Sequence, residues 1–229
     1  MNDIILISAR DLKKSFRSGS VEVPALRGVN FELKQGEFAA LVGPSGSGKS
    51  TLLNLIGALD SPTSGELHVL GQEISKLSKE ERAQLRLTSL GFVFQAYNLV
   101  PVLTAVENVE FVLELQGVGS ERRGRAMAIL SELGLADLAD RRPSELSGGQ
   151  QQRVAVARAV VSRPKLVLAD EPTANLDGSN AESLIGLMQD LRNSYGMTFL
   201  FATHDPRVMG HAARVITLTD GVITQDHVQ

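Results

Sequence analysis

The chain has 229 residues, 43% of them hydrophobic and 21% charged, so it is long enough to bury one large core or a core with a subdomain. A formal net charge of −3 argues against a nucleic-acid-binding protein, and the absence of cysteine excludes disulfides and thiolate metal sites. Residues 1–7 have no basic segment before their short apolar run, and no window holds about 18 uninterrupted apolar residues. We therefore expect no signal peptide and no membrane span. Work at a membrane would require docking on an embedded partner.

Strands and turns dominate the first third of the chain. The residue pattern predicts strands over residues 4–12 and 29–33, with a flexible turn over residues 17–20 between them. A short apolar strand over residues 37–42 leads into a glycine-rich loop, and a helix is expected from Thr51 onward. Another strand is predicted over residues 66–70.

The glycine-rich loop fits the phosphate-binding pattern G-x-x-x-x-G-K-[ST], and the predicted strand before it and helix after it are the context this pattern requires. Its glycines let several backbone N–H groups face one point, and the helix N-terminus adds partial positive charge there. Lys49 can reach the outer phosphates, and the Ser50 hydroxyl can bind a magnesium ion. We therefore predict a nucleoside triphosphate site formed by Gly43, Pro44, Ser45, Gly46, Ser47, Gly48, Lys49, Ser50 and Thr51.

The middle of the chain changes to helical periodicity. Capping-box patterns at residues 78–81 and 104–107 predict two helix starts, and a buried strand is expected between them over residues 91–95. Helical periodicity then continues with interruptions from residue 105 to about residue 138, and a further helix is predicted over residues 151–162, ending before Pro164. This region looks like a helical subdomain inserted into an α/β body.

The last third alternates strands and helices again. Apolar strands are predicted over residues 165–171 and 197–204, and the helix between them is expected to end at Gly196. Asp220-Gly221 predicts a hairpin turn between two final strands. Strands that alternate with helices imply an α/β fold with a mostly parallel sheet covered on both faces.

Several predicted strands end in a polar side chain, and parallel strands bring such ends to the edge where the phosphate loop lies. Asp170 can hold magnesium through water, and Glu171 can orient and deprotonate the attacking water. His204 can donate a hydrogen bond to the γ-phosphate, and Gln95 can sense the metal or the water. Taken singly, a strand-end acid is usually solvated and a lone histidine is usually structural. Because all of these residues occur at the ends of predicted strands, in this order along the chain, we favour the interpretation that they form one catalytic site.

These residues resemble the full motif set of an ATP-binding-cassette (ABC) ATPase, from about residue 10 to residue 224. The stretches that carry the resemblance are residues 43–51, Gln95, residues 146–150 (LSGGQ), residues 165–171, residues 174–177 and His204. The resemblance implies ATP hydrolysis with Mg²⁺ in a single domain with an N-terminal antiparallel β region. It divides the chain into an α/β core at 1–94 and 164–229 and a helical subdomain at 95–163 that carries the LSGGQ signature.

The resemblance also implies that two copies dimerise head to tail, with ATP between the phosphate loop of one copy and the signature of the other. The trans contacts would come from Ser147, Gly148, Gly149, Gln150 and Asp177. The residue types agree, because a serine hydroxyl and glycine N–H groups at a helix start form a second anion site. Phe16 lies where the family carries an aromatic ring that stacks on adenine.

Three phrases, at residues 59–65, 103–109 and 168–177, look like the subgroup that serves macrolide export, lipoprotein release and cell-division signalling. Ala174 departs from the lipoprotein-release members, which usually carry glycine there. The subgroup implies an integral membrane permease as partner and a cytoplasmic protein bound to the inner face of the bacterial inner membrane. The work would be export, or extraction of a lipoprotein, lipid or peptide from the membrane. The alternatives are a regulatory ATPase acting on cell-wall enzymes and a non-transport cassette acting on DNA or ribosomes.

The segment after Gln95, residues 96–103, is unusually apolar for a loop. One interpretation is that this segment packs on the helical subdomain. The other is that it forms the floor of a groove for a short helix of the membrane partner, so that charge at Tyr97 and Leu99 would abolish partner binding.

Overall fold

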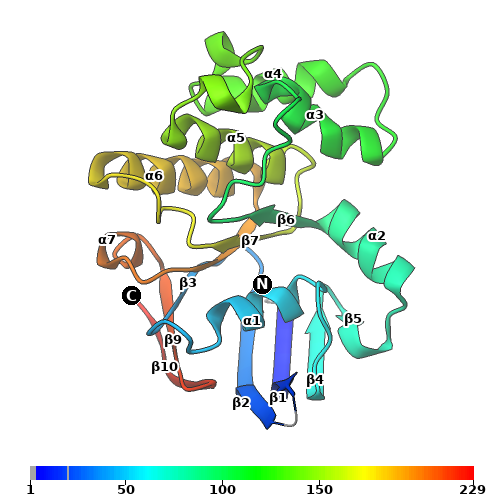
Figure 1. The fold of residues 1–229 in the computed structure, drawn as a ribbon, viewed down its shortest axis with the longest axis vertical. Helices are drawn as coiled ribbons and strands as arrows, with labels where there is room; N and C mark the ends of the chain where they lie inside the picture. The colour runs from blue at the N-terminus through cyan, green and yellow to red at the C-terminus, as the bar shows by residue number, and fades with distance from the viewer. Residues whose placement is uncertain (1–3, 20) are drawn as a thin grey trace.

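Two β-sheets form the body of the structure, a computed structural model that describes residues 4–19 and 21–229 (Figure 1). The N-terminal sheet is antiparallel, with strand order β2-β1-β4-β5. Its strands are β1 (Ile5–Ser18), β2 (Val21–Lys34), β4 (Ser64–Val69) and β5 (Gln72–Glu73). The predicted antiparallel β region is confirmed.

The second sheet has the strand order β10-β9-β3-β8-β7-β6. Its pairs from β9 to β6 are parallel, and β10 runs antiparallel to β9. The strands are β3 (Phe38–Val42), β6 (Leu90–Val93), β7 (Leu166–Asp170), β8 (Thr198–Ala202), β9 (Arg214–Thr219) and β10 (Val222–Val228). The mostly parallel sheet predicted from the sequence is therefore confirmed.

The helices lie on both faces of this sheet, with α3, α4 and α5 grouped at one end of the molecule (Figure 1). The α-helices are α1 (Lys49–Ile56), α2 (Lys79–Ser89), α3 (Ala105–Leu115), α4 (Arg122–Glu132), α5 (Gly148–Val160), α6 (Gly178–Tyr195) and α7 (Pro206–Met209). Short 3₁₀ turns cover Ile74–Lys76, Ala136–Leu138 and Pro143–Glu145. Within the described part of the chain, no helix is both long and apolar enough to cross a bilayer.

Local sequence signals explain where most helices begin and end. Both predicted capping boxes are present, because the side chains of Ser78 and Thr104 accept hydrogen bonds from the backbone three residues on. Gly196 ends α6 with φ of 65°, a conformation that costs glycine little. The helix expected over residues 151–162 instead begins at Gly148, because Ser147 caps it. Our predicted start was therefore three residues late.

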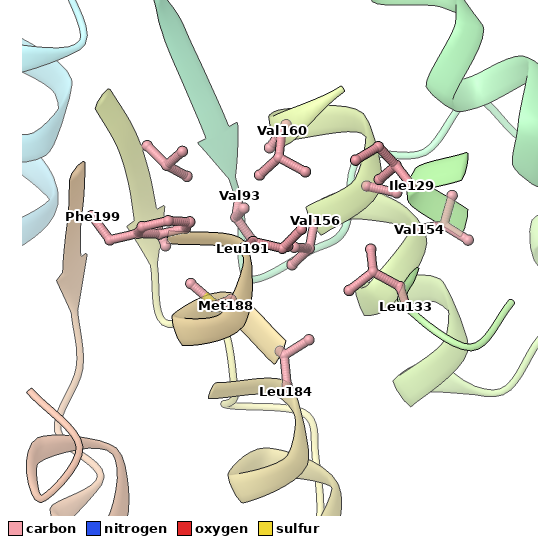
Figure 2. Close-up of a cluster of buried hydrophobic side chains, with 14 of the residues drawn as sticks. Val93, Ile129, Leu133, Val154, Val156, Val160, Leu184, Met188, Leu191 and Phe199 are labelled. Carbon is pink, nitrogen blue, oxygen red and sulfur yellow. The ribbon is translucent and has the colours of Figure 1, made fainter. Parts of the chain in front are cut away.

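The core consists of two clusters, one on each face of the parallel sheet. Neighbouring residues of a strand point to opposite faces, so Phe199 of β8 belongs to one cluster and Leu200 to the other. The first cluster continues into α3–α6, where Val156, Leu184 and Met188 contact the sheet-facing side chains (Figure 2). The second lies between α1 and the N-terminal sheet. Because the first cluster is continuous from the sheet into the helices, the division at residues 94–95 and 163–164 stays a prediction.

The ends of several strands differ from the sequence prediction. β1 and β2 extend to Ser18 and from Val21, because their pairing continues past Phe16 and Val23 to the turn. The predicted turn at residues 17–20 is thus shorter, and Ser20 lies outside the described residues, as do residues 1–3. The strands β6, β7 and β8 end before Gln95, Glu171 and His204. These three residues therefore lie in the loops that leave the sheet edge.

Candidate nucleotide site

The phosphate loop connects β3 to α1, and close packing dictates where its glycines stand. A Cβ on Gly43 would lie 2.0 Å from the Leu218 carbonyl oxygen, and one on Gly48 would lie 2.6 Å from the Ala25 carbonyl oxygen. The loop is also fastened to the β9–β10 turn, where the Gly221 N–H donates to the Ser47 carbonyl at 3.0 Å. Asp220 and Gly221 both have positive φ there, as the predicted hairpin turn requires. These contacts hold the outer side of the phosphate loop, so backbone groups on its inner side are available to a ligand.

Lys49 spans this loop. Its side chain is buried, and its Nζ donates to the carbonyl oxygens of Gly43 at 2.8 Å and Pro44 at 3.0 Å. Gly48 caps α1 without a side-chain hydrogen bond, so the first N–H groups of the helix carry no side-chain cap. A cation and uncapped amides around one point form an anion site.

A cavity of about 530 Å³ opens over the loop. Three predicted residues line it together with residues of the phosphate loop: Gln95, Glu171 and His204. The structure thus brings them to one place, although Gln95 and His204 are 109 positions apart in the sequence. Its lining residues are Ala25, Ser45, Gly46, Gly48, Lys49, Ser50, Thr51, Gln95, Glu171 and His204. A cavity of this size suits a nucleotide.

Asp170 and Ser50 form the part of the site that fits a magnesium ion. The Ser50 hydroxyl donates a hydrogen bond to the Asp170 carboxylate, yet burial raises the pKa of Asp170 above its ordinary value. Among the described residues, Asp170 Oδ1 is buried and has no hydrogen-bond partner. A buried carboxylate oxygen beside a hydroxyl is an incomplete set of hard oxygen ligands, which Mg²⁺ with its waters and phosphates would complete.

Glu171 is held in an uncommon backbone conformation at the end of β7. Its φ is 48°, in the left-handed region, and its N–H donates to the Ala202 carbonyl at 2.9 Å. Its carboxylate Oε1 lies 2.8 Å from His204 Nδ1. A carboxylate oxygen accepts and does not donate, so the His204 tautomer with a proton on Nδ1 donates to Glu171 and orients its carboxylate at the cavity wall.

The LSGGQ signature does not line this cavity. Ser147 Oγ accepts from the Gln150 N–H at 3.3 Å, and Gln150 Oε1 accepts from the Ser147 N–H at 2.8 Å. The serine uses a lone pair as the cap of α5, so its own hydroxyl proton remains available to a ligand. The signature helix start and the cavity over the phosphate loop are thus two separate features of one chain.

Asp177 caps the neighbouring helix α6. The Asn180 N–H donates to its Oδ1 at 3.0 Å, and this bond, with further bonds from Asn180 and Ser179, lowers the pKa of Asp177. A Cβ on Gly149 would lie within 3.8 Å of the Asn180 side chain, so α6 begins beside the signature. Asp177 also stands outside the cavity.

Phe16 lies on the exposed side of the β1–β2 hairpin. It pairs with Val23, two residues before the cavity-lining Ala25 on β2, and 46% of its surface is exposed. Lys14 Nζ lies 5.0 Å from the centre of its ring, as a cation–π contact. The structure places the ring near the cavity without making it part of the lining, so adenine stacking stays a prediction.

Sequence reasoning missed one small residue and two amide residues at or near the site. Ala25 lines the cavity, Gln152 donates to the Pro172 carbonyl at 2.7 Å, and the side chain of Asn175 donates to the Gln95 carbonyl at 2.9 Å. Asn175 belongs to a motif that we singled out, but nothing in the pattern predicts a bond across 80 residues.

A phosphate loop at the carboxyl edge of a parallel sheet, with a serine–aspartate pair and a glutamate beside it, defines a P-loop nucleoside triphosphatase. The chain belongs to the ABC transporter family, whose model matches residues 26–174. It is thus an ATP-hydrolysing ABC ATPase, as the resemblance of its motifs implied.

The chain is similar in sequence to two kinds of curated transporter component. It is 47% identical over 221 residues to the macrolide export ATP-binding/permease protein MacB of Syntrophobacter fumaroxidans, which is 95% of this chain and 31% of that protein. The chain spans about a third of the length of the macrolide-export relatives that it matches. It is also 47% identical over 223 residues to the lipoprotein-releasing system ATP-binding protein LolD 1 of Caulobacter vibrioides, with 96% of this chain and 95% of that protein covered.

Solved structures confirm the fold class. The ATP-binding cassette MJ0796, solved as a dimer in a post-hydrolysis state with ADP and phosphate, superposes with a TM-score of 0.90 at 41% identity. The match covers 97% of this chain and 98% of that chain. A second dimeric structure of MJ0796 matches equally well.

Proposed function

We propose that this ABC ATPase is the subunit that powers a separate integral membrane permease through ATP-driven closure of a homodimer. The work is export, or extraction of a lipoprotein, lipid or peptide from the membrane, and the relatives named for macrolide export and lipoprotein release support this range. The observation that carries the proposal is the separation of the LSGGQ signature from the cavity over the phosphate loop of the same chain.

ATP binds first through this chain's own loop. The phosphates displace the Lys49 ammonium from the carbonyl oxygens of Gly43 and Pro44, and the N–H groups at the start of α1 receive their oxygens. Ser50 and Asp170 would hold Mg²⁺, which neutralises charge on the outer phosphates when bound.

Glu171 then acts as general base. It takes a proton from water as that water attacks the γ-phosphorus in line, and the bond to the β–γ bridging oxygen breaks. His204 orients the carboxylate through its Nδ1 contact. To donate to the γ-phosphate as well, the ring must carry a proton on Nε2 or leave Glu171. Gln95 lies at the cavity wall, where its amide can contact the metal or the water.

A second copy of the chain would supply the LSGGQ signature, which does not line this cavity in the same chain. A head-to-tail dimer would bring the partner's signature to the γ-phosphate, with the hydroxyl proton and helix N-terminus of α5 as anion donors. Release of phosphate and ADP removes the charge that binds the two copies, and the dimer reopens.

The permease would dock in an apolar groove of about 430 Å³. Leu59, Leu87, Phe92 and Val112 are among the residues that line it, and Asn98 of the loop after Gln95 also lines it. This loop therefore connects the groove to the cavity. Docking there would hold the protein at the inner face of the cell membrane, which in a bacterium is the inner membrane.

Two other functions compete with this proposal. A regulatory ATPase that controls cell-wall enzymes would use the same dimer and the same groove, with little transport. A non-transport cassette acting on DNA or ribosomes would not need the groove. The groove favours a membrane-docked ATPase over the non-transport cassette, because it is apolar and opens beside the loop that carries Gln95. The relatives named for macrolide export and lipoprotein release favour transport over regulation.

The experiment that tests the proposal traps the closed dimer. A Glu171→Gln protein should bind ATP and Mg²⁺ but hydrolyse it about 10²–10⁴-fold more slowly, because the amide cannot accept the proton. Analytical ultracentrifugation should then detect an ATP-dependent dimer. Adding Ser147→Ala should abolish this dimer.

A matched control separates loss of the signature from loss of a helix cap. Ser78 and Ser147 each cap a helix in a capping box, so Ser78→Ala should cost a similar ~1 kcal/mol of stability. It should leave the ATP-dependent dimer intact. A Glu171→Gln protein that stays monomeric at saturating ATP, or an equal loss from both serine variants, contradicts the proposal.

A further inference from the structure

A single side chain joins the two loops that meet at the cavity. Asn175 lies in the loop that follows Glu171, and its Nδ2 donates to the backbone carbonyl of Gln95 at 2.9 Å. The two residues are 80 positions apart in the chain. The bond therefore fixes the distance between the loop that carries Asp177 and the loop that carries Gln95.

The Gln95 loop is anchored elsewhere too, but each anchor comes from a different element. Arg158 of α5 donates to the Tyr97 carbonyl at 2.9 Å, and Asn108 of α3 donates to the Val100 carbonyl at 3.2 Å. Both anchors hold the part of the loop that approaches the groove. Among the described residues, Asn175 is the one whose side chain donates to the carbonyl of Gln95 itself.

The other loop is fixed at both of its ends. The Gln152 amide of the signature helix α5 donates to the Pro172 carbonyl at 2.7 Å, and Asp177 caps α6. Between these fixed points, Asn175 projects to the Gln95 loop. A shift of α5 or of Asp177 when a second copy docks would move Asn175 and thereby the Gln95 carbonyl.

We propose that Asn175 is a positioning residue that sets the placement of the Gln95 side chain in the cavity and couples it to docking of the second copy. The inference rests on the proposed function, because the docking that it senses is closure of the dimer. Asn175 does not line the cavity and acts through Gln95.

This role predicts a specific kinetic signature. Asn175 is not among the residues that line the cavity, so ATP affinity should remain unchanged when the bond is lost. Turnover should fall, because Gln95 is less often oriented toward the metal or the water. The loss of one neutral hydrogen bond predicts a fall in kcat of about three- to tenfold.

The test uses an isosteric variant in the full-length protein. Asn175→Asp keeps the shape of the side chain but replaces the donating NH₂ with a carboxylate oxygen, so it should lower kcat at least as much as Asn175→Ala. Asn30→Ala is the matched control, because the exposed Asn30 amide donates to the Gly28 carbonyl at 3.1 Å away from the site. The control should keep wild-type kcat and ATP affinity.

A double-mutant cycle separates positioning from a general structural effect. Gln95→Ala keeps the carbonyl that Asn175 binds but removes the side chain that the bond would position. Asn175→Asp should therefore lower kcat by less than about twofold further in the Gln95→Ala background. If Asn175→Asp does not fold, Asn175→Ala is carried through the same cycle.

Two results would overturn the inference: wild-type kcat in Asn175→Asp, or an undiminished loss in the Gln95→Ala background. Dimerisation of the Glu171→Gln protein is measured separately and does not depend on Asn175. If that protein dimerises and the cycle shows no coupling, the inference alone fails. If it does not dimerise, the proposed function fails with it.

Discussion

At the scale of residues, the site holds groups in states that folding by itself would not favour. Glu171 has a positive φ, and Asp170 has one buried carboxylate oxygen without a hydrogen-bond partner in the described part of the chain. Each of these states costs free energy in the empty protein. Their cost is understandable if ligands complete the site, since a bound cation and nucleotide would supply the missing partners.

The raised pKa of Asp170 gives a testable dependence of stability on pH. Because the folded carboxyl binds its proton more tightly than the unfolded one, its stabilising contribution is full below the ordinary value of 3.8 and is lost as pH rises through the folded pKa. Above the folded pKa of Asp170, the ionised and partly buried group therefore weakens the nucleotide-free protein. Asp170→Asn should raise the free energy of unfolding by ~1 kcal/mol, or the melting temperature by about 2–4 °C.

Thermal unfolding of the nucleotide-free proteins between pH 8 and pH 4 measures this effect. The advantage of Asp170→Asn should shrink as pH falls. With ATP and Mg²⁺ present, the order should reverse, because ligand binding stabilises the wild type more. An advantage that grows toward low pH would show that burial of the charge is not its cause.

At the scale of elements, α2, α3, α5 and β6 together form the groove. Side chains of the loop after Gln95 support both interpretations drawn from the sequence. Leu99 packs against the core cluster, whereas Asn98 lines the groove. The Tyr97 hydroxyl lies 2.9 Å from where a Cβ on Gly148 would be. Charged substitutions at Tyr97 or Leu99 would thus disturb the signature or the core as well as docking.

Leu59 offers a cleaner test of the groove. It lines the groove and is 48% exposed, so Leu59→Glu should fold normally while placing a charge on the apolar surface. We expect it to lose the integral membrane protein that co-purifies from detergent-solubilised membranes, and to keep basal ATP hydrolysis.

Val228→Glu is the control, since Val228 is 77% exposed on β10 and does not line the groove. It should retain the membrane protein, identified by mass spectrometry. Retention by Leu59→Glu as well would place the docking surface elsewhere.

At the scale of the whole molecule, the described chain has two helix starts that could bind an anion, and the proposed nucleotide cavity lies at the first of them. Residues at the start of α1 line the cavity, whereas residues at the start of α5 do not. A symmetric head-to-tail pair uses both, because each copy then contributes one start to each of two sites.

Mixing two inactive variants tests this arrangement. Lys49→Ala removes the phosphate-loop cation, and Ser147→Ala removes the signature hydroxyl. In a mixed dimer, one site carries both defects and the other is intact. An equal mixture should therefore recover up to about a quarter of the wild-type rate, because half of randomly formed dimers are mixed and each has one intact site.

The control is each variant alone at the same total concentration, which should remain inactive. A site completed within one chain would give no recovery on mixing, and a steady-state ATPase assay distinguishes the two outcomes.

Much of the fold and of the candidate site followed from local sequence signals. The phosphate loop, the capping boxes at Ser78 and Thr104, the αL residue Gly196 and the Asp220-Gly221 turn depend on residues close in the chain. Their conformations are set by backbone freedom and by hydrogen bonds to near neighbours. It could also be predicted that Gln95, Glu171 and His204, which follow strand ends, lie close together, because parallel strands share one carboxyl edge.

Only the tertiary structure decided the contacts between distant segments. The bond from Asn175 to Gln95, the contact of Glu171 with His204 and the raised pKa of Asp170 depend on which loops meet and how much water they exclude. Such contacts leave no periodic pattern in the sequence, because they join single residues on loops whose paths the packed sheet and helices determine.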